Sequence, residues 1–245
     1  ADISDSGEAF VLVLEDIRDA TQGDQIRGCA IEDAAAAIHN LALLHASTWD
    51  DQGISEYAWC APTEPDTIAM ILPMALSAFR DRFGAIISEG TGPVFERFVA
   101  GFDRWRELEP ATRAAVHGDY RLDNLLFGGS ARPVTVVDWQ TVDFASPARD
   151  VGYFLGNSLA AADRREHEQA LLEVYVDTLC ANGVTGYDID RCLAETRLGM
   201  FQGPLVTMVG AFVASRSSRS EAMFAVMADR AAAQILDHDA LDLLG

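Results

Sequence analysis

The sequence contains no lysine. All 18 of its basic residues are arginine, against 38 acidic residues, and the formal net charge is −20. A chain this acidic is repelled by phosphate backbones and by anionic membranes, so nucleic acids and membrane surfaces are not expected partners. Cationic small molecules, or anions bridged by metal ions, fit this charge better.

Cysteines and long hydrophobic runs are also scarce. The most apolar stretch, 198–214, is interrupted by polar and helix-breaking residues and falls short of the roughly 20 apolar residues of a membrane helix. The N-terminal ten residues show neither the basic nor the apolar part of a signal peptide. Four scattered cysteines without a CxxC pair favour buried, reduced thiols and a cytoplasmic location over zinc sites or disulfides. They are Cys29, Cys60, Cys180 and Cys192.

The apolar pattern predicts a mainly helical α+β chain. A composition of 49% hydrophobic and 23% charged residues is typical of a folded globular protein. Alanine- and leucine-rich segments with apolar residues at helical spacing predict most of the helices. They cover 31–50, 66–89, 93–108 and, with breaks near Asp163 and at 182–188, 203–204 and 215–220, the region from about 147 to 242.

Four short segments read as strands. "AFVLVLEDI" (9–17) begins as an uninterrupted aliphatic run, which predicts a buried strand. "AAVHGD", "NLLF" and "VTVVDW" predict three more, with "GGSARP" as the turn that joins the last two in a hairpin. The expected order is therefore one strand, several helices, a short β-insert and then more helices.

"HGDYRLDN" (117–124) carries more polar groups than a surface turn needs. Because a hairpin returns the chain, Asp138 at the end of "VTVVD" can lie beside Asn124, and the two offer oxygen ligands for a hard cation such as Mg²⁺. Asp119 is then left to orient an attacking hydroxyl and accept its proton. An isolated HxD is more often a hydrogen-bonded loop, but the complete spacing indicates phosphoryl transfer.

These motifs resemble a known family. "HGDYRLDN" is similar to the catalytic loop of the protein-kinase-like fold, in the HGD form of aminoglycoside phosphotransferases and choline kinases. "VVDWQ" resembles the metal-binding strand end, "FVLVLEDI" the strand and hinge between the two lobes, and "LALLHASTW" the helix that follows. "SPARDVGYFL" resembles the segment whose aspartate braces the catalytic loop. The likeness covers essentially the whole chain and extends to ecdysteroid-kinase-like phosphotransferases.

The resemblance implies a role for each matching position. Asp119 would be the catalytic base. Asn124 and Asp138 would hold Mg²⁺, with ATP as the phosphate donor. His117 and Asp150 would support the loop structurally and take no part in the chemistry.

Two further assignments follow from the same resemblance. Arg121 would stabilise the transferring group as a bidentate donor, or it would form a salt bridge with Asp123 or another acid, and both alternatives stay open. In the hinge, backbone groups around Leu14, Glu15 and Ile17 would meet the adenine.

The implied organisation is a protein-kinase-like fold of which the chain holds mainly the C-lobe. Residues 1–17 would be the last N-lobe strand and the hinge. Residues 18–245 would be the helical C-lobe, with the catalytic loop at 117–124 and the metal-binding strand end at 134–140.

The glycine-rich loop and the lysine of the family's N-lobe do not appear in the sequence. A longer parent protein, a second chain that completes the site, or a binding protein that has lost catalysis would each explain this. The intact set of Asp119, Asn124 and Asp138 argues against the last explanation. We expect the 245 residues to bind ATP poorly by themselves.

The leading functional hypothesis is an ATP-dependent small-molecule O-kinase. Only eleven residues separate Asp138 from Asp150, too few for a long segment that docks a protein substrate. A cationic acceptor is one option, because the C-terminal half is acidic, although most of its acids are expected to be solvated surface. The acids considered are Asp143, Glu173, Asp177 and Glu221.

Two other hypotheses remain. One is a catalytically silent nucleotide- or metabolite-binding protein on the same fold. The other is a metal-dependent hydrolase using Asp119, Asp138 and His117, which suffers because no second motif with ligand spacing supports a two-metal site. The sequence identifies neither the acceptor nor the oligomeric state.

Overall fold

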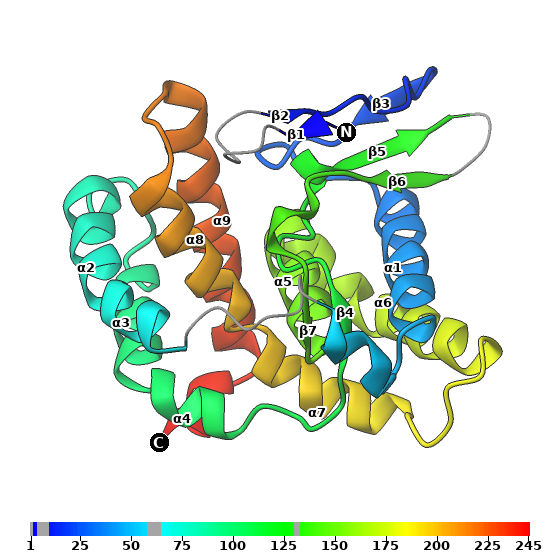
Figure 1. The fold of residues 1–245 in the computed structure, drawn as a ribbon. Helices are drawn as coiled ribbons and strands as arrows, with labels where there is room; N and C mark the ends of the chain where they lie inside the picture. The colour runs from blue at the N-terminus through cyan, green and yellow to red at the C-terminus, as the bar shows by residue number, and fades with distance from the viewer. Residues whose placement is uncertain (1, 4–9, 58–64, 130–132) are drawn as a thin grey trace.

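The fold is mainly helical. The structure, a computed structural model, describes residues 2–3, 10–57, 65–129 and 133–245. Within these ranges helices pack on both sides of a central helix, and most of the short strands lie along one end (Figure 1). The α-helices are α1 (Ile31–Ala46), α2 (Pro65–Phe83), α3 (Thr91–Ala100), α4 (Phe102–Glu107), α5 (Ala148–Ser158), α6 (Ala161–Ala181), α7 (Ile189–Gly199), α8 (Gln202–Val213) and α9 (Ser218–Asp237).

The strands form three small antiparallel sheets. A three-stranded sheet has the order β3-β5-β6, and Leu125 of β5 lies opposite Val136 of β6. A second sheet pairs β4 with β7, and a third pairs β1 with β2. The strands are β1 (Asp2–Ile3), β2 (Phe10–Val11), β3 (Ala20–Gln22), β4 (Ala114–Val116), β5 (Leu125–Gly128), β6 (Val134–Val136) and β7 (Asp143–Ala145).

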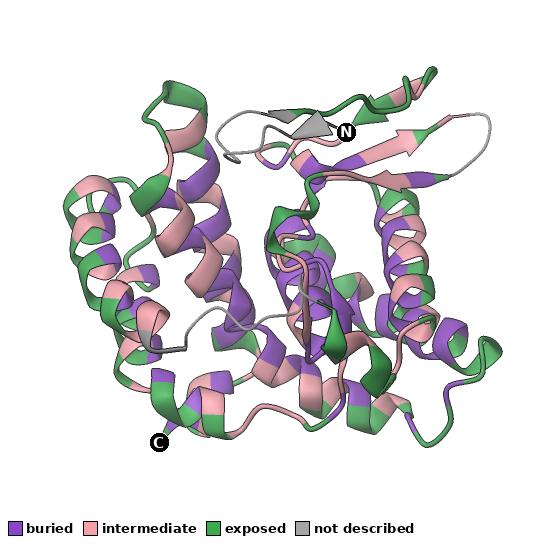
Figure 2. Cartoon of the chain, in the orientation of Figure 1, coloured by how far each residue is buried: buried purple, intermediate pink, exposed green. Residues whose placement is uncertain are grey.

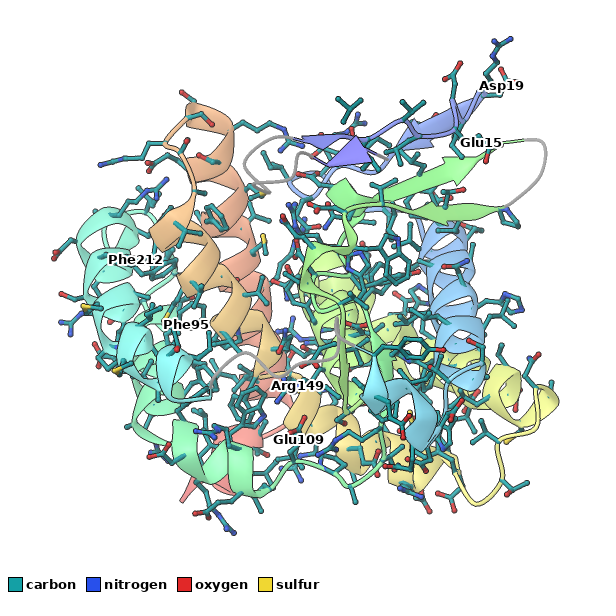
Figure 3. All side chains as sticks on the ribbon, viewed as in Figure 1. Glu15, Asp19, Phe95, Glu109, Arg149 and Phe212 are labelled. Atoms are coloured by element: carbon teal, nitrogen blue, oxygen red, sulfur yellow. The ribbon has the colours of Figure 1, made fainter. Side chains whose placement is uncertain are left out.

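Helix α5 lies between two hydrophobic cores. Its Tyr153 belongs to the core built with α2, α3, α8 and α9, whereas its Phe154 belongs to the core built with α1 and α6. All of its residues except Arg149 are buried, as expected of a helix covered on every face (Figure 2). Arg149 forms an ion pair with Glu109 at 2.9 Å (Figure 3).

Two glycines allow α5 and α7 to cross closely. A Cβ atom on Gly152 would lie 2.5 Å from the carbonyl carbon of Gly199, and one on Gly199 would overlap the carbonyl oxygen of Ala148. Any larger residue at either position would push the helices apart, because backbone atoms cannot move aside as the end of a side chain can. The position of α5 is therefore fixed on two sides by cores and on a third by a backbone contact.

Most of the predicted elements are confirmed, with changes at their ends. The hairpin of "NLLF" and "VTVVDW" is β5–β6, although residues 130–132 of its turn lie outside the described residues. The expected helix 93–108 is instead two helices, α3 and α4, which meet at Gly101; a Cβ atom there would lie 2.8 Å from the Leu244 side chain. Strands β3 and β7 were not predicted.

The expected buried strand over 9–17 is wrong. Pairing is confined to Phe10 and Val11, and the chain from Leu12 to Ile17 has no regular structure. Val13 is 82% exposed and Leu14 is 71% exposed, and this stretch lies on the outside of the fold (Figure 2). The aliphatic run remains in solvent because, among the described residues, no layer packs over it.

Two features bear on the expected cellular setting. Cys192 is buried and Cys29 is half-buried, but Cys180 is exposed, so the expectation of buried thiols is wrong for Cys180. All three are free, and Cys60 lies outside the described residues. Among the helices described, none combines the length and the apolar character needed to cross a bilayer.

Candidate active site

The loop after β4 turns sharply at Gly118. Its φ of +79° lies in the left-handed region, and a Cβ atom there would sit 2.5 Å from the carbonyl oxygen of Thr141. Glycine adopts this conformation without steric cost, and other residues do so rarely. The Thr141 hydroxyl also donates to the carbonyl oxygen of His117 at 2.8 Å. The loop is thereby pressed against the turn that follows β6.

Asp150 holds the backbone of this loop. Its two carboxylate oxygens accept hydrogen bonds from the amides of His117 (2.6 Å) and Gly118 (2.9 Å). Asp150 is 0% exposed and lies in the first turn of α5, where the helix dipole favours a negative charge. Nε2 of the buried His45 lies 3.5 Å from one carboxylate oxygen. The aspartate therefore fixes the start of the loop from inside the protein.

His117 ties the loop to the hairpin. Its ring is buried, and Nδ1 accepts a hydrogen bond from the amide of Asp119 at 3.3 Å. Nε2 therefore carries the proton and donates to the carbonyl oxygen of Val137 at 3.0 Å. Because both ring nitrogens are used in this way, the observed contacts of His117 are structural.

The carboxylate of Asp119 is held by three donors. The Tyr153 hydroxyl donates to Oδ1 at 2.8 Å, and the Asn124 amide donates to Oδ2 at 2.9 Å. Nε of Arg121 lies 3.1 Å from both oxygens. The Asp119 side chain is 17% exposed, so it remains accessible at the surface of the loop. These contacts give the carboxylate one defined orientation.

Arg121 bridges two carboxylates. Besides Asp119, its Nη1 contacts Asp123 at 3.1 Å and the sulfur of Met223 at 3.4 Å. Burial by itself lowers the pKa of Arg121, but the charges of Asp119 and Asp123, together with other contacts, raise it by more. The guanidinium therefore stays charged. Of the two alternatives left open by the sequence, the salt bridge is the arrangement observed.

The hairpin brings Asn124 and Asp138 to neighbouring positions. The amide of Val137 donates to the carbonyl oxygen of Asn124 at 3.0 Å, which places the residue after Val137 beside the loop. Asp138 is exposed and has a left-handed backbone (φ 64°, ψ 62°), which aspartate tolerates better than most residues. Both side-chain hydrogen bonds of Asn124 are donated by its nitrogen, so its oxygen can face a ligand. A carboxylate and an amide oxygen form a donor set that fits Mg²⁺, which usually takes its other ligands from phosphate and water.

Sequence reasoning missed Gln25, a second support of the loop. This residue is 0% exposed, and its Oε1 accepts a hydrogen bond from the amide of Leu122 at 2.9 Å. Its Nε2 donates to the carbonyl oxygen of Asn157 at 2.8 Å, and its backbone amide donates to Asp123 at 2.9 Å. Nothing in "QGDQIRG" signals this role, because the contacts join residues about one hundred positions apart.

Tyr153 and His45 were missed as well. The Tyr153 hydroxyl reaches Asp119. The buried His45 lies against Asp150 and contacts the Tyr175 hydroxyl at 2.7 Å. One signal was present for Tyr153. It follows Asp150 by three residues, and residues so spaced share one face of a helix.

The predicted hinge residues do not join this cluster. Leu14 and Glu15 are exposed and Ile17 is half-buried, and all three precede β3 in the irregular segment. Glu15 and Asp19 point away from the body of the molecule (Figure 3). In the described ranges, no hydrogen bond links Leu14, Glu15 or Ile17 to residues 117–124.

The acids considered for a cationic acceptor are dispersed. Asp143 lies opposite Val116 in the β4–β7 ladder, next to the catalytic loop. Glu221 instead pairs with Arg82 at 2.8 Å and with Arg216 at 3.1 Å. The other two, Glu173 and Asp177, lie on α6. Only Asp143 of these four borders the site.

Part of the chain matches a known family, and its fold is similar to that of several solved structures. Residues 87–183 match the ecdysteroid kinase-like family. The fold is similar to that of an ethanolamine kinase from Plasmodium vivax (TM-score 0.53, 12% identity), with coverage of 86% of this chain and 62% of that one. It is also similar to the choline kinase LicA from Streptococcus pneumoniae (0.50, 13%; 91% and 69%). An aminoglycoside phosphotransferase from Alicyclobacillus acidocaldarius gives a third match (0.51, 16%; 89% and 69%).

These matches define the fold. The chain has the protein-kinase-like fold of small-molecule phosphotransferases, with a helical C-lobe and little of the N-lobe. Its central residues are similar to the ecdysteroid kinase-like family, so the resemblance predicted from the sequence is confirmed. The chain spans 62% of the length of the ethanolamine kinase and 69% of the other two. No curated protein matches the sequence.

Proposed function

We propose that this chain carries the catalytic centre of an ATP-dependent kinase that transfers the γ-phosphate to a hydroxyl of a small molecule. One observation carries the proposal. The Asp119 carboxylate is fixed by three donors in a braced loop, and that loop adjoins the hairpin end with Asn124 and Asp138. Phosphoryl transfer depends mostly on positioning and on neutralising charge, and this arrangement supplies groups for both.

Asp119 is the group that would act on the acceptor. Its carboxylate would align the attacking hydroxyl and take its proton, a contribution of about 10²–10⁴-fold in general-base catalysis. Arg121 would stabilise the transferring group only if it exchanged a contact with Asp119 or Asp123 for a phosphate oxygen. This fits arginine, which binds carboxylate and phosphate through the same bidentate geometry.

Asn124 and Asp138 would hold Mg²⁺ through their side-chain oxygens. When bound, the ion would neutralise the charge on the phosphate oxygens of ATP. The exposure of Asp138 and the orientation of the Asn124 amide support this assignment. The adenine would lie against the segment around Leu14, Glu15 and Ile17.

The division of the chain follows from these roles. Residues 1–17 would be the end of the N-lobe and the hinge, and residues 18–245 the C-lobe. A cationic acceptor would contact Asp143, which lies beside the loop. We expect the protein to act in the cytoplasm. Because the chain spans about two thirds of the relatives' length, we expect it to bind ATP weakly by itself.

A catalytically silent binding protein is the second candidate. The observation that favours it is the contact of Arg121 Nε with both oxygens of Asp119, since the guanidinium occupies the oxygens that a base would offer to the acceptor hydroxyl. The two candidates differ in turnover and agree in fold. The hydrolase hypothesis has no similar support, since among the described residues no three His, Cys, Asp or Glu side chains are grouped to hold a metal.

The experiment is an ADP-release assay on the full-length protein, with hydroxylated metabolites, choline-like cations and aminoglycosides as acceptors. The kinase proposal expects ADP release that depends on one acceptor class, requires Mg²⁺ and is lost in Asp119→Asn. ATP or acceptor binding without turnover against every class would favour the silent binding protein. Metal-dependent release of phosphate from a phosphorylated form of such a compound, in the absence of ATP, would point to a hydrolase.

A further inference from the structure

One turn of α5 makes two different contacts with the catalytic loop. Asp150 accepts hydrogen bonds from the loop's backbone amides at His117 and Gly118. Tyr153, three residues further, donates its hydroxyl to the Asp119 carboxylate at 2.8 Å. Residues three apart lie on the same face of a helix, so one helical turn reaches both the backbone of the loop and its central side chain.

Tyr153 differs from the other donors to Asp119 in where it comes from. Arg121 and Asn124 belong to the loop itself and would move with it. Tyr153 comes from a helix in the interior and is 0% exposed. Among the described contacts of the carboxylate, the hydrogen bond from Tyr153 is the one that connects Asp119 to the core of the protein.

The helix that carries Tyr153 is well suited to act as a fixed reference. It is buried between two cores and crosses α7 at Gly152, where the backbones are in contact. Burial, followed by the charge of Asp119, raises the pKa of Tyr153 well above its usual range. The hydroxyl therefore keeps its proton and remains a donor at neutral pH.

We propose that Tyr153 is a positioning residue whose hydroxyl sets the orientation of the Asp119 carboxylate toward the acceptor hydroxyl. The inference rests on the proposed kinase function and deepens it. Tyr153 acts through Asp119 and does not touch the reacting atoms. Without the hydroxyl, Oδ1 would keep only its contact with Arg121, and the carboxylate would turn toward that side chain.

The first test does not depend on activity. Crystal structures of the full-length protein and of Tyr153→Phe are compared at the Asp119 side chain, with Tyr187→Phe as the control. Tyr187 is also buried, and its ring packs edge-on against Trp49, away from the loop. We expect the carboxylate to rotate toward Arg121 in Tyr153→Phe alone. An Asp119 side chain that keeps its orientation would overturn the proposal.

The second test separates positioning from folding. In Tyr153→Phe we expect kcat to fall about 10- to 100-fold, because small misplacements of a catalytic group cost about that much, while the KM for Mg·ATP changes less than about twofold. Replacing Tyr153 by 4-aminophenylalanine, which retains a donor at the same place, should restore most of kcat. Tyr187→Phe should leave kcat unchanged.

The outcomes distinguish this inference from the function on which it rests. A fall in kcat that 4-aminophenylalanine does not restore, or that Tyr187→Phe reproduces, would show a structural role and overturn the inference. If the wild-type protein shows no turnover with any acceptor, the proposed function fails, and the crystallographic comparison still decides whether Tyr153 orients Asp119.

Discussion

The loop 117–124 and the N-terminal segment contrast sharply in how they are held. Residues 117–124 are fixed by Asp150, Gln25 and Tyr153, all of which come from other elements and are buried. Residues 12–17 have no regular structure, and the side chains of Leu12, Val13 and Leu14 are exposed. The sequence of each segment was predicted to resemble the same family, so resemblance in sequence does not explain the difference.

The difference lies in whether the chain supplies partners for each segment. The loop offers backbone amides and charged side chains to buried residues elsewhere in the chain. Asp150 and Gln25 accept hydrogen bonds from its amides, and Tyr153 donates one to Asp119. The N-terminal segment contributes apolar side chains, and the described part of the chain covers few of them. Under the proposed function, the groups that would act on acceptor and metal lie in the well-held region, whereas the predicted hinge residues make few contacts within the described part of the chain.

The largest effect on turnover is expected at Asp119, in the loop 117–124. Asp119→Asn in the full-length protein should lower turnover by about 10²–10⁴-fold, because the amide cannot accept the proton of the acceptor hydroxyl. The isosteric change keeps the shape of the side chain, so the melting temperature should change little. Steady-state kinetics measures the turnover, and thermal unfolding of the same samples measures the melting temperature.

A matched control is Asp229→Asn on α9. Asp229 also accepts several hydrogen bonds, from Ser88 and Thr91, but lies outside the loop and its supports. It should cost stability and leave turnover per folded molecule unchanged. Near wild-type turnover in a folded Asp119→Asn would contradict the mechanism.

Asp150, which holds the backbone of the loop, should matter most for the free energy of unfolding. Asp150→Ala leaves the buried amides of His117 and Gly118 without acceptors, and each such loss costs about 1–3 kcal/mol, so we expect the free energy of unfolding to fall by about 3 kcal/mol. Urea unfolding measures it. The control is Asp103→Ala, an 87% exposed residue 4.0 Å from Arg106, which should cause no measurable change. Equal losses of unfolding free energy in the two variants would show that the buried Asp150 contributes no more to stability than an exposed residue does.

The close crossing of α5 and α7 should show a smaller loss. Gly152→Ala places a methyl group 2.5 Å from the backbone of Gly199, and overpacking of this kind costs about 1–3 kcal/mol. Gly92→Ala in α3 is the control, since a Cβ atom there meets nothing within 4 Å. It should be neutral or stabilise by up to about 1 kcal/mol. A neutral Gly152→Ala would mean that α5 can shift without cost.

The smallest effect is expected in the exposed segment. Val13→Ser should change the free energy of unfolding of the 245-residue chain by less than about 0.5 kcal/mol, because the side chain is already 82% exposed. A loss above about 1.5 kcal/mol in urea unfolding would show that this segment packs in the folded state. The comparison between the two regions would then fail.

The sequence predicted what depends on local pattern. Helical spacing located α1, and turn residues between two apolar runs located the β5–β6 hairpin. The motif HGDYRLDN marked the loop, since its spacing is itself the signal. Asn124 and Asp138 were expected to be neighbours because a hairpin fixes the register of its own strands.

What could not be predicted depends on contacts between distant residues. Gln25 reaches Leu122 across 97 positions, and Tyr153 reaches Asp119 across 34. An aliphatic run indicates a buried strand only if another layer covers it, so 9–17 was predicted wrongly from a sound pattern. Gly101 divided an expected helix where the distant residue Leu244 packs against it.

The most direct test of the account compares two aspartates in one binding experiment. Mg·ATP affinity of the full-length protein is measured by calorimetry for wild type, Asp119→Asn and Asp138→Asn, with melting temperatures on the same samples. We predict that Asp138→Asn weakens Mg·ATP binding at least tenfold without a matching loss of stability, and that Asp119→Asn changes it less than about twofold, because one residue serves the metal and the other the acceptor. Equal affinities in all three proteins, or losses that follow the melting temperatures, would contradict it.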